Sequence, residues 1–199
     1  MFLLPFMKAR LESWEDRSLA SGSAGPPPAN AFHDRHERIV AVESPGEPEA
    51  EGPFTRVARA ILSYEIFPAR VGKPVLRRAV QPGDAVGLRY HFLPGLDLFF
   101  ASRVVRVFTR QLADGWWSSG FTYQTLEGHP EQGEETFSVL KRHATGEVRV
   151  LIFAWSRPRW PILQPVLPLA RHLQLAAGRA ALDNLEQVAR SASRAPSPV

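Results

Sequence analysis

The sequence predicts an α+β fold in which a curved antiparallel sheet of about six or seven strands grips a long C-terminal helix. Segments with alternating or β-branched residues succeed one another from residue 75 to residue 156. Turns such as Pro82-Gly83 and Asp114-Gly115 separate them. Such short connections join antiparallel strands, because parallel strands need long crossovers. A helical repeat of apolar residues follows the sheet and places one long helix near the end of the chain.

A short strand and a short helix are expected before the sheet. The strand covers residues 38–43 and ends at the turn Ser44-Pro45-Gly46. The helix covers residues 53–64, because Gly52-Pro53 begins it and apolar residues recur within it at helical spacing. The strands of the sheet are expected at 75–80, 84–92, 98–109, 115–126, 134–142 and 147–156.

The C-terminal helix is expected over residues 165–189. Its apolar residues fall on one stripe, which we expect to face an apolar surface: Val166, Leu169, Leu173, Ala176, Ala177 and Ala180. A sheet that curls around a helix commonly leaves a cavity between the two, so a ligand cavity is expected there.

The folded domain is expected to cover residues 33–190. Residues 1–32 are interpreted as a leader and flexible linker, because 18–31 are small, rich in Gly and Ser, and contain three consecutive prolines. Residues 191–199 have no periodicity and are expected to be a disordered tail.

Composition excludes several classes of protein and site. The absence of cysteine rules out disulfides, thiolate metal sites and a cysteine nucleophile. The net charge of +4 is spread over the chain without a basic stripe, so nucleic-acid binding is not expected. No segment has the roughly 20 apolar residues of a membrane helix and no secretory signal is recognisable, so a cytoplasmic protein is expected. Phosphate-loop and dinucleotide motifs are missing, and no cofactor is expected.

The most distinctive segment runs from Gly120 to Phe137. It reads Gly-Phe-Thr-Tyr-Gln-Thr-Leu-Glu-Gly-His-Pro-Glu-Gln-Gly-Glu-Glu-Thr-Phe, and Ser156-Arg157-Pro158 follows one strand later. This pattern resembles a family of bacterial and plant proteins catalogued as a domain of unknown function, number nineteen-ninety. The resemblance covers residues 37–188 and implies a helix-grip fold like that of START and Bet v 1 proteins, which often hold apolar ligands. It implies no established activity, and Gln124 departs from it, because the family usually has glycine there.

The strands around this motif have definable faces, because side chains alternate along a strand. Trp117, Phe121 and Tyr123 share one face of the first strand, and Glu135 and Phe137 share one face of the second. Arg157 is in phase with Trp155 on the third strand. We expect Tyr123, Glu135 and Arg157 to converge inside the domain, with His129 at the rim.

Two interpretations of this convergence stay open. In one, the group orients the polar head of a ligand or performs acid–base chemistry. In the other, a buried Glu135–Arg157 ion pair and a Tyr123 hydrogen bond hold the sheet together, because a buried charge needs a partner. A metal site is not expected, since Glu134 and Glu135 point to opposite faces and cannot share one ion with His129.

The leading functional hypothesis is the binding of a small apolar or amphipathic molecule. The candidate ligand-binding residues are Tyr123, Glu135, Arg157, His129, Trp117, Phe121, Phe137 and Trp155. The alternatives are an enzyme that uses Glu135 or His129 as a base and Tyr123 as a donor, and an interaction protein whose leader docks on a partner.

Overall fold

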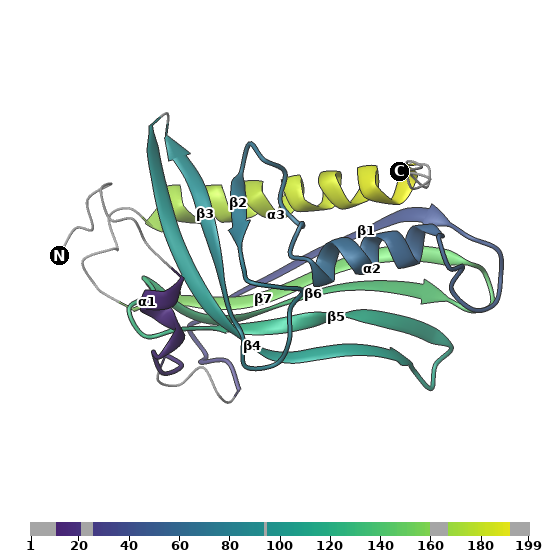
Figure 1. Ribbon diagram of the computed structural model, residues 1–199, viewed down its shortest axis with the longest axis horizontal. Helices are drawn as coiled ribbons and strands as arrows, with labels where there is room; N and C mark the ends of the chain where they lie inside the picture. The colour runs from purple at the N-terminus through teal and green to yellow at the C-terminus, as the bar shows by residue number, and fades with distance from the viewer. Residues whose placement is uncertain (1–10, 21–25, 94, 160–166, 192–199) are drawn as a thin grey trace.

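The computed structural model describes residues 11–20, 26–93, 95–159 and 167–191. Seven strands form one antiparallel sheet in the order β1-β7-β6-β5-β4-β3-β2 (Figure 1). The predicted α+β helix-grip architecture is confirmed. The strands are β1 (Phe32–Val42), β2 (Gly72–Val75), β3 (Ala85–Leu93), β4 (Leu96–Gln111), β5 (Trp116–Thr125), β6 (Glu131–Arg142) and β7 (Glu147–Pro158); the helices are α1 (Glu12–Glu15), α2 (Pro53–Leu62) and α3 (Leu167–Arg190).

Two shifts of register, at Ile39/Ala41 in β1 and at Val104/Arg106 in β4, bend the strands of the curled sheet. The β6–β7 turn depends on Gly146, whose φ is +72°, a conformation that side chains disfavour. A Cβ at this position would also collide with the carbonyl of Glu43, where β1 ends beside the turn. Strand β1 is longer than expected because it pairs with β7 from Phe32↔Ser156 to Val42↔Glu147.

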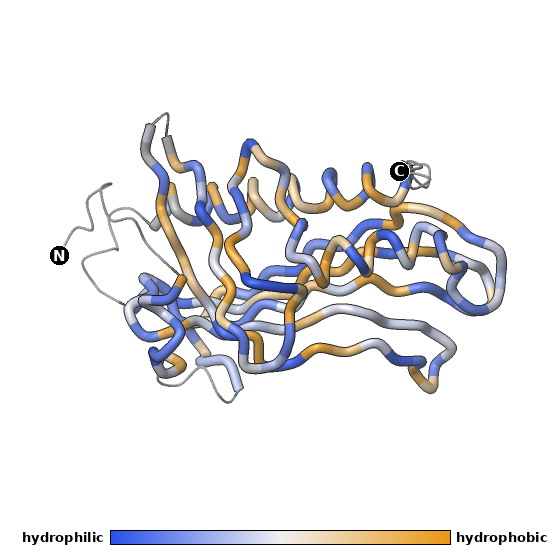
Figure 2. The backbone as a smooth tube through the Cα atoms, in the orientation of Figure 1, coloured by the Kyte–Doolittle hydropathy of each residue, from blue (hydrophilic) through white to orange (hydrophobic). Residues whose placement is uncertain are grey.

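The core lies on the concave face of the sheet, which α2 and α3 cover (Figure 1). Phe121, Phe137 and Ile152 of the sheet are buried against Ile61 of α2 and Leu185 of α3. Hydrophobic and hydrophilic segments alternate along both helices, as expected for helices that bury one side (Figure 2).

The face that α3 buries differs from the predicted stripe. Ala181, Leu182 and Leu185 are buried, whereas Leu169 of the stripe is 51% exposed. Both faces of α3 carry apolar residues, so the apolar pattern alone did not decide which side packs. Contact with α2 and β1 decides it, and of the stripe alanines Ala180 is buried whereas Ala176 and Ala177 keep some accessible surface.

A buried ion pair fixes the start of α2. Lys141 Nζ lies 2.8 Å from Glu43 Oε2, and neither side chain retains accessible surface. The second carboxylate oxygen of Glu43 accepts a hydrogen bond of 2.5 Å from the backbone N–H of Phe54. Because Gly52 precedes the helix and has no side chain to cap it, the carboxylate of Glu43 takes that role.

Residues 11–20 belong to the folded domain, which therefore begins earlier than the expected boundary at residue 33. Leu11 and Trp14 are buried in a second cluster, on the convex face, with Ala101 and Leu126. The backbone N–H of Ala20 donates to the carbonyl of Thr125 at 2.9 Å. Linker-like composition from residue 18 onward concealed this packing. The interaction hypothesis rested partly on residues 1–10, which lie outside the described residues, as does the predicted tail from 192.

The predicted strand at 75–80 is wrong. Strand β2 covers Gly72–Val75, and residues 77–79 form a bend before Val80, whose N–H donates to the carbonyl of Leu62 at 2.9 Å. Val80 and Leu76 pack in or against the main core cluster instead of continuing a strand. Among the described residues, no helix is long and apolar enough to cross a membrane.

Candidate functional site

Tyr123 and Glu135 meet on the concave face, as predicted. They are direct cross-strand partners on β5 and β6. The hydroxyl of Tyr123 donates to Glu135 Oε2 at 2.6 Å, which is short for a hydrogen bond and typical of a charge-assisted one. Both side chains are enclosed by protein yet keep some accessible surface. The pair is therefore neither fully exposed nor sealed in the core.

Glu135 has no cationic partner among the described residues. Burial raises the pKa of Glu135 to about 7, the Tyr123 hydrogen bond lowers it in part, and the nearby carboxylates of Asp34 and Glu131 raise it further. At neutral pH this carboxyl is therefore divided between its acid and its conjugate base. Burial also raises the pKa of Tyr123 well above its usual value, so its phenol stays a neutral donor.

Tyr64, which follows α2, extends this network and escaped the sequence analysis. Its hydroxyl forms a hydrogen bond with Tyr123, and its ring packs edge-on against Tyr123 with centroids 6.3 Å apart. Tyr64 has a φ of +58°, which is uncommon for any residue except glycine. This backbone conformation places the buried side chain of Tyr64 over the sheet. No local sequence motif predicts this position.

The predicted aromatic residues of the concave face surround the pair. Phe121 and Phe137 are fully buried, and their ring centroids lie 5.5 Å apart. The Phe137 ring centroid lies 5.6 Å from that of Tyr123. Trp117 packs at the edge of the same cluster, and its buried Nε1 has no hydrogen-bond partner among the described residues. A cluster of packed aromatic side chains thus lies beside the Tyr123–Glu135 pair.

His129 lies near the start of β6, where its ring is 5.3 Å from that of Phe100. Burial lowers the pKa of His129 to about 4, so the imidazole is neutral at physiological pH. Its Nδ1 accepts a hydrogen bond of 3.1 Å from the backbone N–H of Glu131, which shapes the turn. No contact joins His129 to Glu135 among the described residues, so the structure does not bring these two predicted bases together.

The expected convergence of Arg157 is wrong. Arg157 is paired with Gln132 across the β6–β7 ladder, and its Nε donates to Gln132 Oε1 at 2.6 Å. Gln132 alternates with Glu135 along β6 and lies on the convex face. Trp155 shares the phase of Arg157 and is buried on that same face. The alternation of side chains along β7 explains why the prediction was wrong. Ile152 is buried on the concave face, and Arg157, an odd number of residues further along the strand, therefore points to the convex face.

Gln124, where the resembled pattern has glycine, also lies on the convex face. Its Nε2 donates to Glu134 Oε2 at 2.8 Å across the β5–β6 ladder. This side chain therefore leaves the concave face free. Among the described residues, no group of three or more potential ligands gathers in a way that would hold a metal ion.

A second set of polar side chains lines the same end of the concave face. Asp34 of β1 forms an ion pair with Arg171 of α3, and Glu131 accepts a hydrogen bond of 2.5 Å from Gln174 Nε2. These contacts tie the first turns of α3 to β1 and β6. The sequence analysis missed them because their partners are far apart in the chain, and only the way α3 crosses the sheet brings them together.

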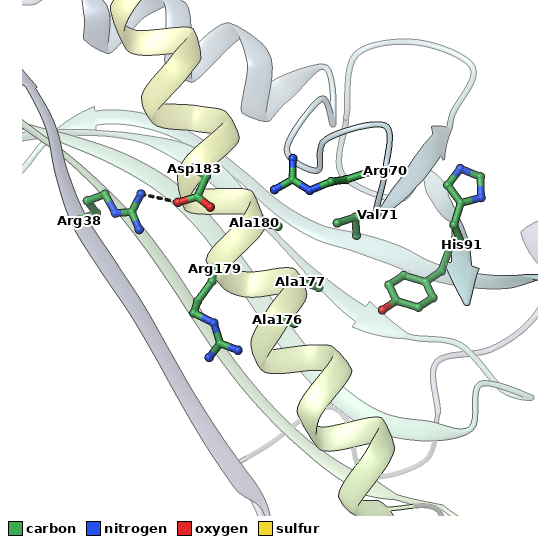
Figure 3. A pocket seen from close by; sticks show the side chains of 10 residues that line it. Arg38, Arg70, Val71, His91, Ala176, Ala177, Arg179, Ala180 and Asp183 are labelled. Carbon is green, nitrogen blue, oxygen red and sulfur yellow. Dashed lines mark hydrogen bonds and ion pairs between the residues drawn. The ribbon is translucent and has the colours of Figure 1, made fainter. Parts of the chain in front are cut away.

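An open pocket of about 470 Å³ lies elsewhere, along α3 (Figure 3). None of the eight predicted site residues lines it. Its lining comes from β1, α3, β3 and the link before β2: Arg38, Arg70, Val71, Tyr90, His91, Ala176, Ala177, Arg179, Ala180 and Asp183.

Comparison with protein families identifies the chain. The family described as "Domain of unknown function (DUF1990)" matches residues 16–184. The chain belongs to this family. The DUF1990 match begins at residue 16 and so includes part of the segment that packs on the convex face, which agrees with the early start of the folded domain. The family predicted from the Gly120–Phe137 motif is confirmed. No curated protein sequence is similar enough to count as a relative.

Several solved structures share the fold of this DUF1990 chain. Hypothetical protein jhp0584 from Helicobacter pylori is 14% identical with a TM-score of 0.51, over 81% of this chain and 88% of that one. The di-domain ARO/CYC protein BexL from the BE-7585A biosynthetic pathway is 15% identical with a TM-score of 0.53, over 83% of this chain and 52% of that one. StfQ, the di-domain ARO/CYC protein of the steffimycin pathway, is 12% identical with a TM-score of 0.52, over 80% and 51%. These likenesses establish the fold, which is of the Bet v 1 and START type.

Proposed function

We propose that this DUF1990 protein binds a small amphipathic molecule between the sheet and α3, with its polar head at the Tyr123–Glu135 pair. The observation that carries the proposal is a carboxyl without a cationic partner, held by one phenol and still partly accessible on the concave face. A carboxyl in such surroundings is costly to bury unless another group satisfies it. A ligand head that donates to the free oxygen of Glu135 supplies that group.

The charges around Glu135 limit the kind of head group. Asp34 and Glu131 both raise the pKa of Glu135, which means that they repel negative charge from this position. An anionic head is therefore disfavoured, whereas a hydroxyl or an amine donates a hydrogen bond and an amine adds charge attraction. We expect ligands with a hydroxyl or an amino group at one end.

The aromatic residues beside the pair suit the apolar part of such a ligand. Tyr64 packs against Phe121 and Phe137 with ring centroids 5.8 and 6.4 Å apart, and these three buried rings support Tyr123, which keeps some accessible surface. An aromatic or aliphatic part of the ligand gains from contact with the Tyr123 side chain, because both surfaces lose water on binding.

Native mass spectrometry tests the proposal. The full chain is purified from its own host without detergent and weighed before and after denaturation. A defined extra mass that leaves on denaturation is expected. The Glu135→Ala variant should lose this mass, and the control Glu134→Ala, which removes a carboxyl from the convex face, should keep it. An apo mass, together with no thermal stabilisation by a panel of amphipathic alcohols and amines, would contradict the proposal.

Acid–base catalysis is the second candidate, because the pKa of Glu135 is raised to about 7. A group with this pKa accepts or returns a proton near neutral pH, and the neutral Tyr123 hydroxyl beside it is a hydrogen-bond donor. If the bound molecule is converted, Glu135→Gln should abolish turnover and preserve binding, since glutamine keeps the shape and loses the titrating proton. Equal turnover by this variant would exclude Glu135 as the base.

A further inference from the structure

The open pocket along α3 lies between this helix and residues of β1, β3 and the link before β2. Ala176, Ala180 and Asp183 recur at helical spacing and line the pocket, whereas Leu185 and Ala189 lie on the opposite side, in the core. Neither Tyr123 nor Glu135 lines this pocket of about 470 Å³. It is large enough for a small organic molecule.

The floor and the walls of the pocket differ in chemistry. Three alanines of the predicted apolar stripe form the floor: Ala176, Ala177 and Ala180. Arginine side chains border this floor, with Arg70 reaching toward α3 from the link before β2, and Arg38 and Arg179 beside the helix (Figure 3). An apolar floor between guanidinium groups suits a molecule with an apolar body and an anionic group.

Three donors in this lining have no partner among the described residues. The guanidinium groups of Arg70 and Arg179 and the hydroxyl of Tyr90 make neither an ion pair nor a side-chain hydrogen bond to any residue that the structure describes. Partial burial raises the pKa of the Tyr90 phenol, so it remains a neutral donor. Three arginines of the sheet, by contrast, are paired with carboxylates: Arg35, Arg38 and Arg149.

The negative charge inside the pocket is already compensated. Arg38 Nη1 lies 2.7 Å from Asp183 Oδ1 and 2.8 Å from Glu186 Oε2, and Glu186 also pairs with Arg190. His91 forms a hydrogen bond of 2.7 Å with Asp97, whose carboxylate does not line the pocket. The positive charges of Arg70 and Arg179 are left without a matching carboxylate, so the pocket attracts anions.

We propose that this pocket binds the oxyanion group, a carboxylate or a phosphate, of a small molecule whose apolar part rests on the alanines of α3. Arg70, Arg179 and Tyr90 donate to the oxyanion, and the geometry of guanidinium groups suits both carboxylate and phosphate. This specificity is opposite to that proposed for the acidic interior around Glu135, so the two sites take different ligands.

Calorimetric titration of the full chain with octanoate, octyl phosphate and octanol tests this proposal. Both anions should bind and octanol should bind at least tenfold more weakly, since a hydrogen bond to a charged group contributes about 1.5–3 kcal/mol. Arg179→Gln and Arg70→Gln should each weaken binding of the anions about tenfold by the same reasoning. A preference for octyl phosphate or for octanoate would tell which oxyanion the pocket favours.

Arg89→Gln is the matched control. Arg89 is exposed on β3 and does not line the pocket, and its replacement by glutamine removes the same charge as the two test variants. Equal weakening by this control, octanol binding as tight as octanoate, or no heat of binding with either anion would overturn the proposal. Loss of anion binding in Glu135→Ala would also overturn it, because the interior site would then be the one that holds the anion.

Discussion

The ammonium group of Lys141 lies 2.8 Å from a carboxylate oxygen of Glu43, and neither side chain has any accessible surface. Lys141 also donates to the carbonyl of Glu47 at 2.7 Å, and Glu43 caps α2 through the N–H of Phe54. A lysine of β6, the end of β1 and the start of α2 are therefore joined at one buried point. This point holds α2 against the concave face, where Tyr64 must lie for the candidate site to form.

Removal of one partner should be costly at this point. Lys141→Met leaves the Glu43 carboxylate buried without its cation, and such a change typically costs about 3–5 kcal/mol of unfolding free energy. Urea unfolding followed by circular dichroism measures it. Arg59→Gln breaks the exposed Arg59–Glu51 pair, at 3.1 Å, and should change stability little. Equal losses in the two variants would mean that the buried pair does not hold α2.

Glu135 should make the protein less stable as the pH rises. The pKa of Glu135 is about 7 in the folded chain against an ordinary 4.5, so between these values the folded state keeps a proton that the unfolded state has lost. Stability should therefore fall from about pH 4.5 to pH 7 and level off above. Urea unfolding of Glu135→Gln should lack this component, and at pH 8 the variant should be more stable than the wild type.

Glu134→Gln is the control for this pH dependence. This variant removes the neighbouring carboxyl on the convex face, and its stability should still decline between pH 4.5 and pH 7.

Tyr123→Phe should raise the pKa of Glu135, as measured in a separate titration by ¹³C NMR, because the hydrogen bond that favours the carboxylate is gone. An unchanged pKa in this variant would show that the 2.6 Å contact is not made in solution.

Trp14 should be essential to the packing on the convex face. Trp14 is 6% exposed, contacts Phe99 with ring centroids 6.3 Å apart, and lies under the guanidinium of Arg17 at 4.0 Å. Trp14→Ala should cost about 3–5 kcal/mol, as for other buried tryptophans. The exposed neighbour Glu12→Ala is the control for thermal unfolding and should leave the melting temperature nearly unchanged. An equally small effect of both changes would restore the expected boundary at residue 33.

Gly178 allows α3 to approach β1. A Cβ at this position would lie 2.5 Å from Nε2 of His36 and within 2.9 Å of two further ring atoms. Gly178→Ala should therefore destabilise the protein by on the order of 1–3 kcal/mol, in spite of the better helix propensity of alanine. In a His36→Ala background the same change should stabilise by about 1 kcal/mol. A double-mutant cycle measures this reversal, and two independent effects would contradict the proposed contact.

Much of the fold was predictable because local patterns agree with it. Turn glycines, alternating strands and the terminal helix gave the sheet and its order along the chain. The two-residue period of strands also placed Tyr123, Glu135, Phe121 and Phe137 on one face, and the structure keeps them together. The predicted face of Arg157 was wrong, because it depends on which β7 residues face the core. The alternation of residues along β7 does not by itself show which set faces inward.

The sequence by itself determined the family, the helix-grip class and the pairing of Tyr123 with Glu135, because each depends on local periodicity or on one contiguous motif. Only the tertiary structure decided which side of α3 is buried, that Trp14 packs on the sheet, and that Arg70, Arg179 and Tyr90 share a pocket. These relations join residues from distant parts of the chain. Their geometry is set by helix rotation and strand register, which packing fixes only when the whole domain has formed.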